Sequence, residues 1–142
     1  MSKDATNSNY IPGSCNIGKG EIRQRQVVAL IGAVLTIIAA VGLNSNEDPN
    51  PPRFFIFFPA LIFAIGFVQS RRRFCLAYGF AGTFNFGKLG KISKVAAPED
   101  KKADRKMALK IMGQSLLLAL AITITYTSLG LIGDFVSTIF GN

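Results

Sequence analysis

The chain has 142 residues, enough for one domain, and nearly half of these residues are apolar. The apolar residues come in three blocks separated by charged segments, which favours a small membrane protein over a soluble domain. The net charge of +8 gathers beside these blocks, so the positive-inside rule accounts for it and we expect no nucleic-acid partner. Since the sequence contains no histidine, the commonest metal ligand and general base is missing, and we expect neither a metal site nor a cofactor.

The first segment, residues 1–21, is predicted as a polar tail rich in Ser, Asn and Gly at its start. Because an apolar run begins only at Val27, we expect no signal peptide. The first transmembrane helix is predicted over about residues 22–43. It reaches a full span only if two arginines near its start extend their side chains to the membrane boundary, and these are Arg23 and Arg25.

One face of this first helix carries small residues at helical spacing. They are Ala29, Gly32, Ala33, Thr36 and Ala40. Small residues let helix backbones approach closely, so we predict that this face packs against another helix. The alternative is that Ala and Gly are simply common in membrane helices.

A hydrophilic loop with three prolines, Asn44–Arg53, predicts a short connection between antiparallel helices. The second transmembrane helix is predicted over about residues 54–70, so that residues 22–70 form a hairpin. Pro59 lies about one turn inside this helix and predicts either a kink or a late helix start. Because both apolar blocks are short, a re-entrant hairpin that does not cross the membrane stays open as an alternative.

Residues 71–97 are predicted as a basic and aromatic loop at the membrane interface. Three consecutive arginines, Arg71, Arg72 and Arg73, follow the second helix and are expected to set the topology or to contact lipid headgroups. Glycines interrupt any long helix in this segment. Its aromatic residues predict a belt at headgroup depth, and they are Phe74, Tyr78, Phe80, Phe84 and Phe86.

A basic amphipathic helix is predicted to begin at Pro98 and to run over residues 98–134, with acidic residues in its first turn. Its apolar part, about residues 111–132, is the third predicted transmembrane helix, and residues 135–142 are predicted as a C-terminal tail. The basic part carries more charge than topology requires, so we expect it to contact anionic lipid headgroups or an acidic partner. The cations concerned are Lys101, Lys102, Arg105 and Lys106.

The predicted fold is therefore an all-α membrane protein with three transmembrane helices. An N-terminal antiparallel hairpin is followed by a long third helix with a basic cytoplasmic extension. Most cations lie before the first block or between the second and third, only Arg53 lies in the first loop, and none follows Lys110. This distribution predicts a cytoplasmic N-terminus and an external C-terminus, and we expect the membrane to be a bacterial plasma membrane.

Two cysteines lie close to the ends of the predicted hairpin, Cys15 before the first helix and Cys75 after the second. Antiparallel helices bring both to one membrane face, so we predict that the two thiols can approach each other. The nearby cluster Arg71–Arg73 would favour a thiolate. A reversible disulfide, a persulfide-handling thiol and palmitoylation are the chemical outcomes considered, and the alternative is that both thiols are inert.

Two short motifs flank the hairpin. Asn16, Gly18, Glu21 and Arg25 resemble an Asn-x-Gly-x-x-Asp-x-x-x-Arg lead-in, and Cys75, Tyr78 and Gly82 resemble a Cys-x-x-Tyr-x-x-x-Gly exit. Over roughly residues 15–86 the chain thus resembles the small rhodanese-associated inner-membrane domains of the YgaP type. It differs in its Pro-rich inter-helix loop, its third helix and the lack of a rhodanese domain. The resemblance implies a helical hairpin with dimer-like packing and no established chemistry.

The sequence offers no nucleophile–base pair and no dinucleotide or phosphate-loop motif, so we do not expect an enzyme. The first hypothesis is an accessory or structural subunit that packs against a larger membrane protein complex or associates with itself. The second is a small homo-oligomeric transporter or channel, lined by Gln114, Ser115, Thr125 and Ser128 of the third helix. The third is a thiol-redox membrane protein that uses Cys15 and Cys75.

Overall fold

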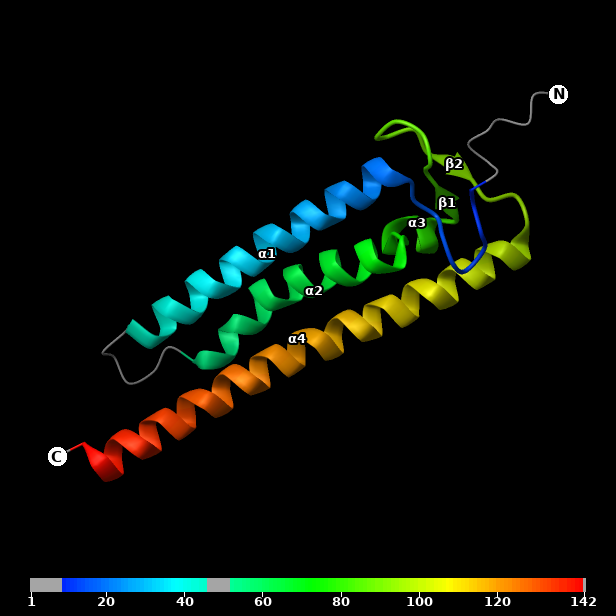
Figure 1. Ribbon diagram of the computed structural model, residues 1–142. Coiled ribbons are helices and arrows are strands. Elements are labelled where there is room, and N and C mark those ends of the chain that lie inside the picture. The colour runs from blue at the N-terminus through cyan, green and yellow to red at the C-terminus, as the bar shows by residue number, and fades with distance from the viewer. Residues whose placement is uncertain (1–8, 46–51, 142) are drawn as a thin grey trace.

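The computed structural model describes residues 9–45 and 52–141 of the chain. Three long helices lie side by side in it, α1 (Lys19–Ser45), α2 (Phe57–Arg72) and α4 (Pro98–Phe140) (Figure 1). A 3-10 helix, η1 (Arg53–Ile56), leads into α2, and with it all three helices are long and apolar enough to cross a membrane. The prediction of a mostly helical membrane protein is therefore confirmed at this level.

The helices α1 and α2 run in opposite directions (Figure 1), and their backbones approach closely at two glycines. A side chain on Gly32 of α1 would collide with the backbone of Phe63, and one on Gly66 of α2 would meet the backbone nitrogen of Ala29 at 2.6 Å. Only glycine permits so close an approach. Pro59 lies in the first turn of α2, where no intrahelical N–H is needed, and the α-helix begins only after η1, as a late helix start would require.

The helix α2 lies between α1 and α4 (Figure 1). The contact between α2 and α4 is built on alanines, with Ala60 and Ala64 packed against Ala119. Nearer the start of α4, a second buried cluster joins Phe74 to Ala108 and Ile111. Small residues again allow close helix packing, while many of the large apolar side chains of α1 and α4 are exposed.

The segment after α2 is more structured than the predicted loop. It contains α3 (Leu76–Ala81) and two short antiparallel strands, β1 (Thr83–Phe84) and β2 (Ser93–Lys94). Phe74 is fully buried and Phe84 is 5% exposed, so the predicted aromatic belt is wrong for these two residues. Both are held inside because the chain turns back over the ends of the helices.

A further difference lies at the C-terminal end. The predicted tail over residues 135–142 is helical as far as Phe140, because α4 continues through it. The hydroxyls of Ser137 and Thr138 donate to the Asp134 carbonyl and so do not interrupt the helix. Residues 1–8 of the predicted N-terminal tail, residues 46–51 of the predicted first loop and residue 142 lie outside the described residues.

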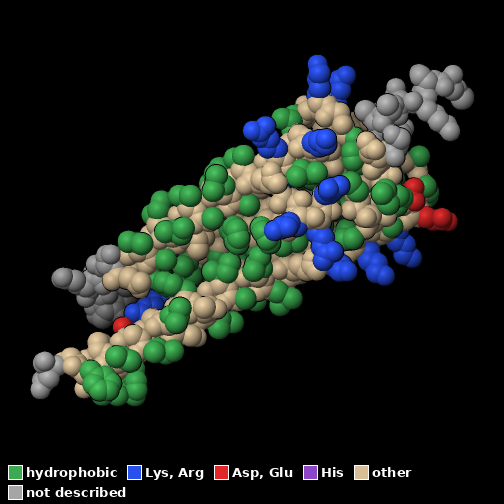
Figure 2. Space-filling view, viewed as in Figure 1, with side chains coloured by type: hydrophobic (Ala, Val, Ile, Leu, Met, Phe, Trp, Pro, Cys, Tyr) green, Lys and Arg blue, Asp and Glu red, His purple; other side chains and the backbone are tan. Residues whose placement is uncertain are grey.

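One end of the helices is covered by a compact region that we call the cap. It consists of the N-terminal segment 10–17, α3, the strands β1 and β2, and the first turns of α4. Ile17 pairs with Asn85 beside β1, and the Tyr10 ring stacks on Phe84 with centroids 4.7 Å apart. Lys and Arg side chains gather over this end (Figure 2).

Candidate functional site

The described residues with the most polar contacts meet where the cap joins α1 and α2. We call this group the basal polar cluster, and it consists of Asn16, Glu21, Arg25, Cys75, Tyr78 and Asn85. These side chains come from the N-terminal segment, the first turns of α1, the α2–α3 connection, α3 and the residue after β1. The cluster therefore joins parts of the chain that are far apart in sequence.

Asn16 is the central residue of this junction and is fully buried. Its Oδ1 accepts a hydrogen bond from the Cys75 backbone N–H at 2.7 Å, and its Nδ2 donates to the Cys75 carbonyl at 3.1 Å. Its own backbone N–H donates to the Arg73 carbonyl, and its carbonyl accepts from Asn85. An amide side chain suits this position because it donates and accepts at once.

Glu21 supplies a carboxylate that is only 4% exposed. Its Oε1 accepts hydrogen bonds from the Tyr78 hydroxyl at 3.0 Å and from Asn85 Nδ2 at 3.1 Å. Its Oε2 lies 3.6 Å from Arg25 Nη2, one helical turn along α1. A buried carboxylate is tolerated only with such partners, and the two donors and the guanidinium provide them.

Arg25 also contacts the one buried thiol. Its Nη2 donates to Cys75 Sγ at 3.1 Å, and Cys75 is 1% exposed. Two buried atoms of this pair of charged side chains, Glu21 Oε2 and Arg25 Nε, have no hydrogen-bond partner among the described residues. The thiol is thus enclosed beside a cation and cannot be reached from solvent without opening the cap.

A second polar junction holds the N-terminal segment against α4. Asp104 is fully buried, and its two carboxylate oxygens accept from the Tyr10 hydroxyl and from the Gly13 backbone N–H, each at 2.7 Å. Burial and the hydrogen bond to Asp104 raise the pKa of Tyr10 above its usual value. Burial and the hydrogen bond to Glu21 likewise raise the pKa of Tyr78.

The two predicted cysteines contact different partners in the structure. Both are free thiols, and Cys15 Sγ lies 3.8 Å from the Ile17 carbonyl while Cys75 Sγ contacts Arg25. The arginine beside Cys75 is therefore Arg25, whereas the predicted Arg71–Arg73 cluster is exposed at the end of α2.

The predicted cationic residues of α4 divide into two groups. Lys102, Arg105 and Lys106 are exposed, whereas Lys101 is half-buried with its aliphatic stem over Gly82. Asp104 lies among them but faces inward. On α1, Arg23 is exposed at the same end of the molecule.

The predicted small-residue face of α1 meets two environments. Ala29 and Gly32 lie at the contact with α2, and Ala33 is half-buried beside them. Thr36 and Ala40, further along the helix, line an open groove between α1 and α4.

The sequence reasoning missed three buried polar residues and the half-buried Tyr10. Asn85 and Gln69 give no pattern that marks them, and Tyr10 and Asp104 meet across 94 positions of sequence. By contrast, all seven residues quoted for the two short motifs lie in or against the cap. Five of them belong to the basal polar cluster, while Gly18 packs on the Phe86 backbone and Gly82 ends α3 with a φ of 66°.

The chemistry available to this site is limited. Among residues 9–45 and 52–141, no group of three or more His, Cys, Asp or Glu side chains is placed to hold a metal ion. The polar side chains of the cluster contact one another and the backbone, which fixes the cap to the helices. Comparison with protein-family models, with curated proteins and with solved structures finds no match for this chain.

Proposed function

We propose that this protein is a non-enzymatic accessory subunit that packs against a larger membrane protein complex. One observation carries the proposal, namely that the buried polar side chains of the cap hold its own segments together while its cations face outward. Asn16, Glu21 and Asp104 all bind partners within the chain. A cap built in this way offers a rigid basic surface to a partner.

The basic surface is the part of the molecule best suited to a partner. Lys102, Arg105 and Lys106 lie on one side of the first turns of α4, and Figure 2 displays the gathering of basic side chains at this end. Such a surface complements an acidic face of a neighbouring membrane protein and also attracts anionic headgroups. Under the positive-inside rule this end lies in the cytoplasm, with the C-terminus outside, as in a bacterial plasma membrane.

Charge reversal tests the proposal. The triple variant Lys102→Glu, Arg105→Glu, Lys106→Glu is compared with Lys88→Glu, Lys91→Glu, Lys94→Glu, which makes the same change in net charge in β2 and in the connection between β1 and β2. A partner captured in mild detergent is expected to be lost with the first variant and at raised salt, and retained with the second. Equal retention by both variants would refute the role of this surface, and a protease-protection assay with a tagged N-terminus tests the orientation.

The transporter alternative receives little support from α4. The buried hydroxyls of Ser115 and Thr123 donate to the carbonyls four residues earlier, and Thr125 does the same. These groups therefore have partners in their own helix and do not line a polar path within one chain. Ion flux through proteoliposomes of the purified protein would revive the alternative.

The thiol-redox alternative meets a similar difficulty. Cys75 is buried against Arg25, and Cys15 Sγ lies against the Ile17 carbonyl. Reaction between the two thiols would require the cap to open. Normal function of the Cys15→Ser, Cys75→Ser double variant would remove this alternative.

A further inference from the structure

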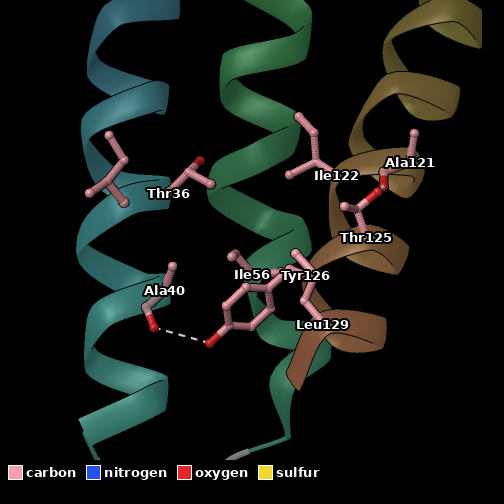
Figure 3. A pocket seen from close by; sticks show the side chains of 9 residues that line it. Thr36, Ala40, Ile56, Ala121, Ile122, Thr125, Tyr126 and Leu129 are labelled. Atoms are coloured by element: carbon pink, nitrogen blue, oxygen red, sulfur yellow. Dashed lines mark hydrogen bonds between the residues drawn. The ribbon is translucent and has the colours of Figure 1, made fainter. Parts of the chain in front are cut away.

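An apolar groove lies between α1 and α4, towards the end of the helices that faces away from the cap (Figure 3). Because α2 separates the two outer helices, they form the sides of the groove and Ile56 closes it from behind. Its volume is about 440 Å³, within the range of small-molecule pockets. Thr36 and Ile37 line one side, and Ile122 and Leu129 the other.

The walls of the groove offer no free polar group. The Thr36 hydroxyl donates to the Gly32 carbonyl at 2.7 Å, and the Thr125 hydroxyl donates to the Ala121 carbonyl at 2.8 Å. Both threonines thus present methyl groups to the groove. Water has too few partners here to fill it, so an aliphatic ligand suits the surface.

One end of the groove is polar. The Tyr126 ring crosses from α4 to α1, where its hydroxyl lies 3.0 Å from the Ala40 carbonyl oxygen and 3.1 Å from Asn44 Oδ1. Beyond it, Arg53 Nη2 lies 3.0 Å from Asp134 Oδ2. The Arg53 guanidinium lies directly against Gly130, the residue after the groove-lining Leu129.

We infer that this groove binds one acyl chain of a zwitterionic phospholipid whose headgroup carries a phosphate and a primary amine. The phosphate contacts Arg53, and the ammonium contacts Asp134. Arg53 is 28% exposed and Asp134 64% exposed, so both side chains can bind a headgroup while they remain paired. A purely anionic headgroup would meet Arg53 favourably but would also meet the Asp134 carboxylate.

The length of the groove agrees with this ligand. About 20 Å of helix axis separates Ala121 from Asp134 at 1.5 Å a residue, and one leaflet with its headgroups contributes half of a bilayer about 40–45 Å thick. A chain anchored at the Arg53–Asp134 pair therefore reaches the inner end of the groove. A second copy of the protein fits less well, because Ile37 and Leu129 at the rim are large and 63% and 65% exposed, whereas close helix contacts require small residues.

Tryptophan fluorescence tests the inference, because the natural chain contains no Trp. The variant Ile37→Trp reports on the groove. Ile38→Trp is its matched control, since Ile38 is the next residue, is 61% exposed and does not line the groove. Each variant is placed in phosphatidylcholine vesicles that contain an equal fraction of either phosphatidylethanolamine or phosphatidylglycerol with brominated acyl chains, which quench Trp on contact.

Quenching of Ile37→Trp is expected to be at least two-fold stronger with the brominated phosphatidylethanolamine, and quenching of Ile38→Trp equal with both lipids. Adding Arg53→Gln or Asp134→Asn to Ile37→Trp should remove the difference. The inference is overturned if both positions show the same preference, which would indicate ordinary boundary lipid. It is also overturned if Ile37→Trp is not quenched at all, which would indicate a protein helix in the groove, or if the preference survives both headgroup substitutions.

Discussion

Replacement of Asn16 by Ala is the most informative test of the basal polar cluster. The change leaves the buried Cys75 N–H without its acceptor at 2.7 Å, and it removes the 3.1 Å bond to the Cys75 carbonyl, which keeps a hydrogen bond from the Gly79 N–H. A buried group left unpaired costs about 1–3 kcal/mol and the loss of an ordinary hydrogen bond about 0.5–1.5 kcal/mol, so we expect a loss of roughly 1.5–4.5 kcal/mol in the free energy of unfolding. Asn16→Asp should also destabilise the protein, because it removes the donor and buries a charge.

The measurement combines global and local readouts. Denaturation in mixed micelles gives the change in unfolding free energy, and hydrogen exchange gives the protection of the backbone amide of Cys75. Asn9→Ala is the matched control, because Asn9 is exposed and should leave both readouts unchanged. Unchanged exchange at Cys75 in the Asn16→Ala variant, with stability within about 0.5 kcal/mol of the wild type, would refute the role assigned to this side chain.

Three further outcomes are expected. Gly32→Leu should lower the free energy of unfolding by about 1–3 kcal/mol or more, because it forces α1 away from α2. Its control is Gly42→Ala, which should be close to neutral in the same denaturation assay because Gly42 has open space around it. The stabilising contribution of the neutral Tyr10 hydroxyl should be complete below pH about 10 and should be lost as pH rises through the raised pKa of Tyr10. Denaturation at several pH values should therefore show that the unfolding free energy of Tyr10→Phe falls less steeply with rising pH than that of the wild type. An identical fall in the two proteins would refute the assignment. A maleimide reagent should modify Cys15 well before Cys75, which mass spectrometry of timed samples measures; equal rates would show that the cap opens readily.

Local patterns in the sequence were sufficient for the long helices. The apolar block around Gly32 and the apolar part of α4 are visible as hydropathy, and both form helices of the required length. The end of α4 was not predictable in this way. A tail is suggested by Gly133, Asp134 and the following Ser and Thr. The hydroxyls of Ser137 and Thr138 bond back to the helix, however, and the helix continues to Phe140.

The structure of the cap could not be predicted from local sequence patterns, for a different reason. Its hydrogen bonds join residues that are 59 positions apart at Asn16 and Cys75, and 94 apart at Tyr10 and Asp104. Nothing near Asp104 marks it as buried, since Lys102, Arg105 and Lys106 around it are exposed cations. The two short motifs did point to residues that meet in the cap, while membership of the YgaP-type family and the approach of the two thiols stay predictions.

Purification from native membranes tests the central proposal most directly. The tagged full-length chain is extracted in mild detergent, and the proteins that elute with it are identified and quantified by mass spectrometry. An accessory subunit should elute with at least one larger membrane protein at a fixed molar ratio that survives size-exclusion chromatography. Elution of the chain alone, under conditions in which other membrane complexes of the same cells stay intact, would contradict the proposal.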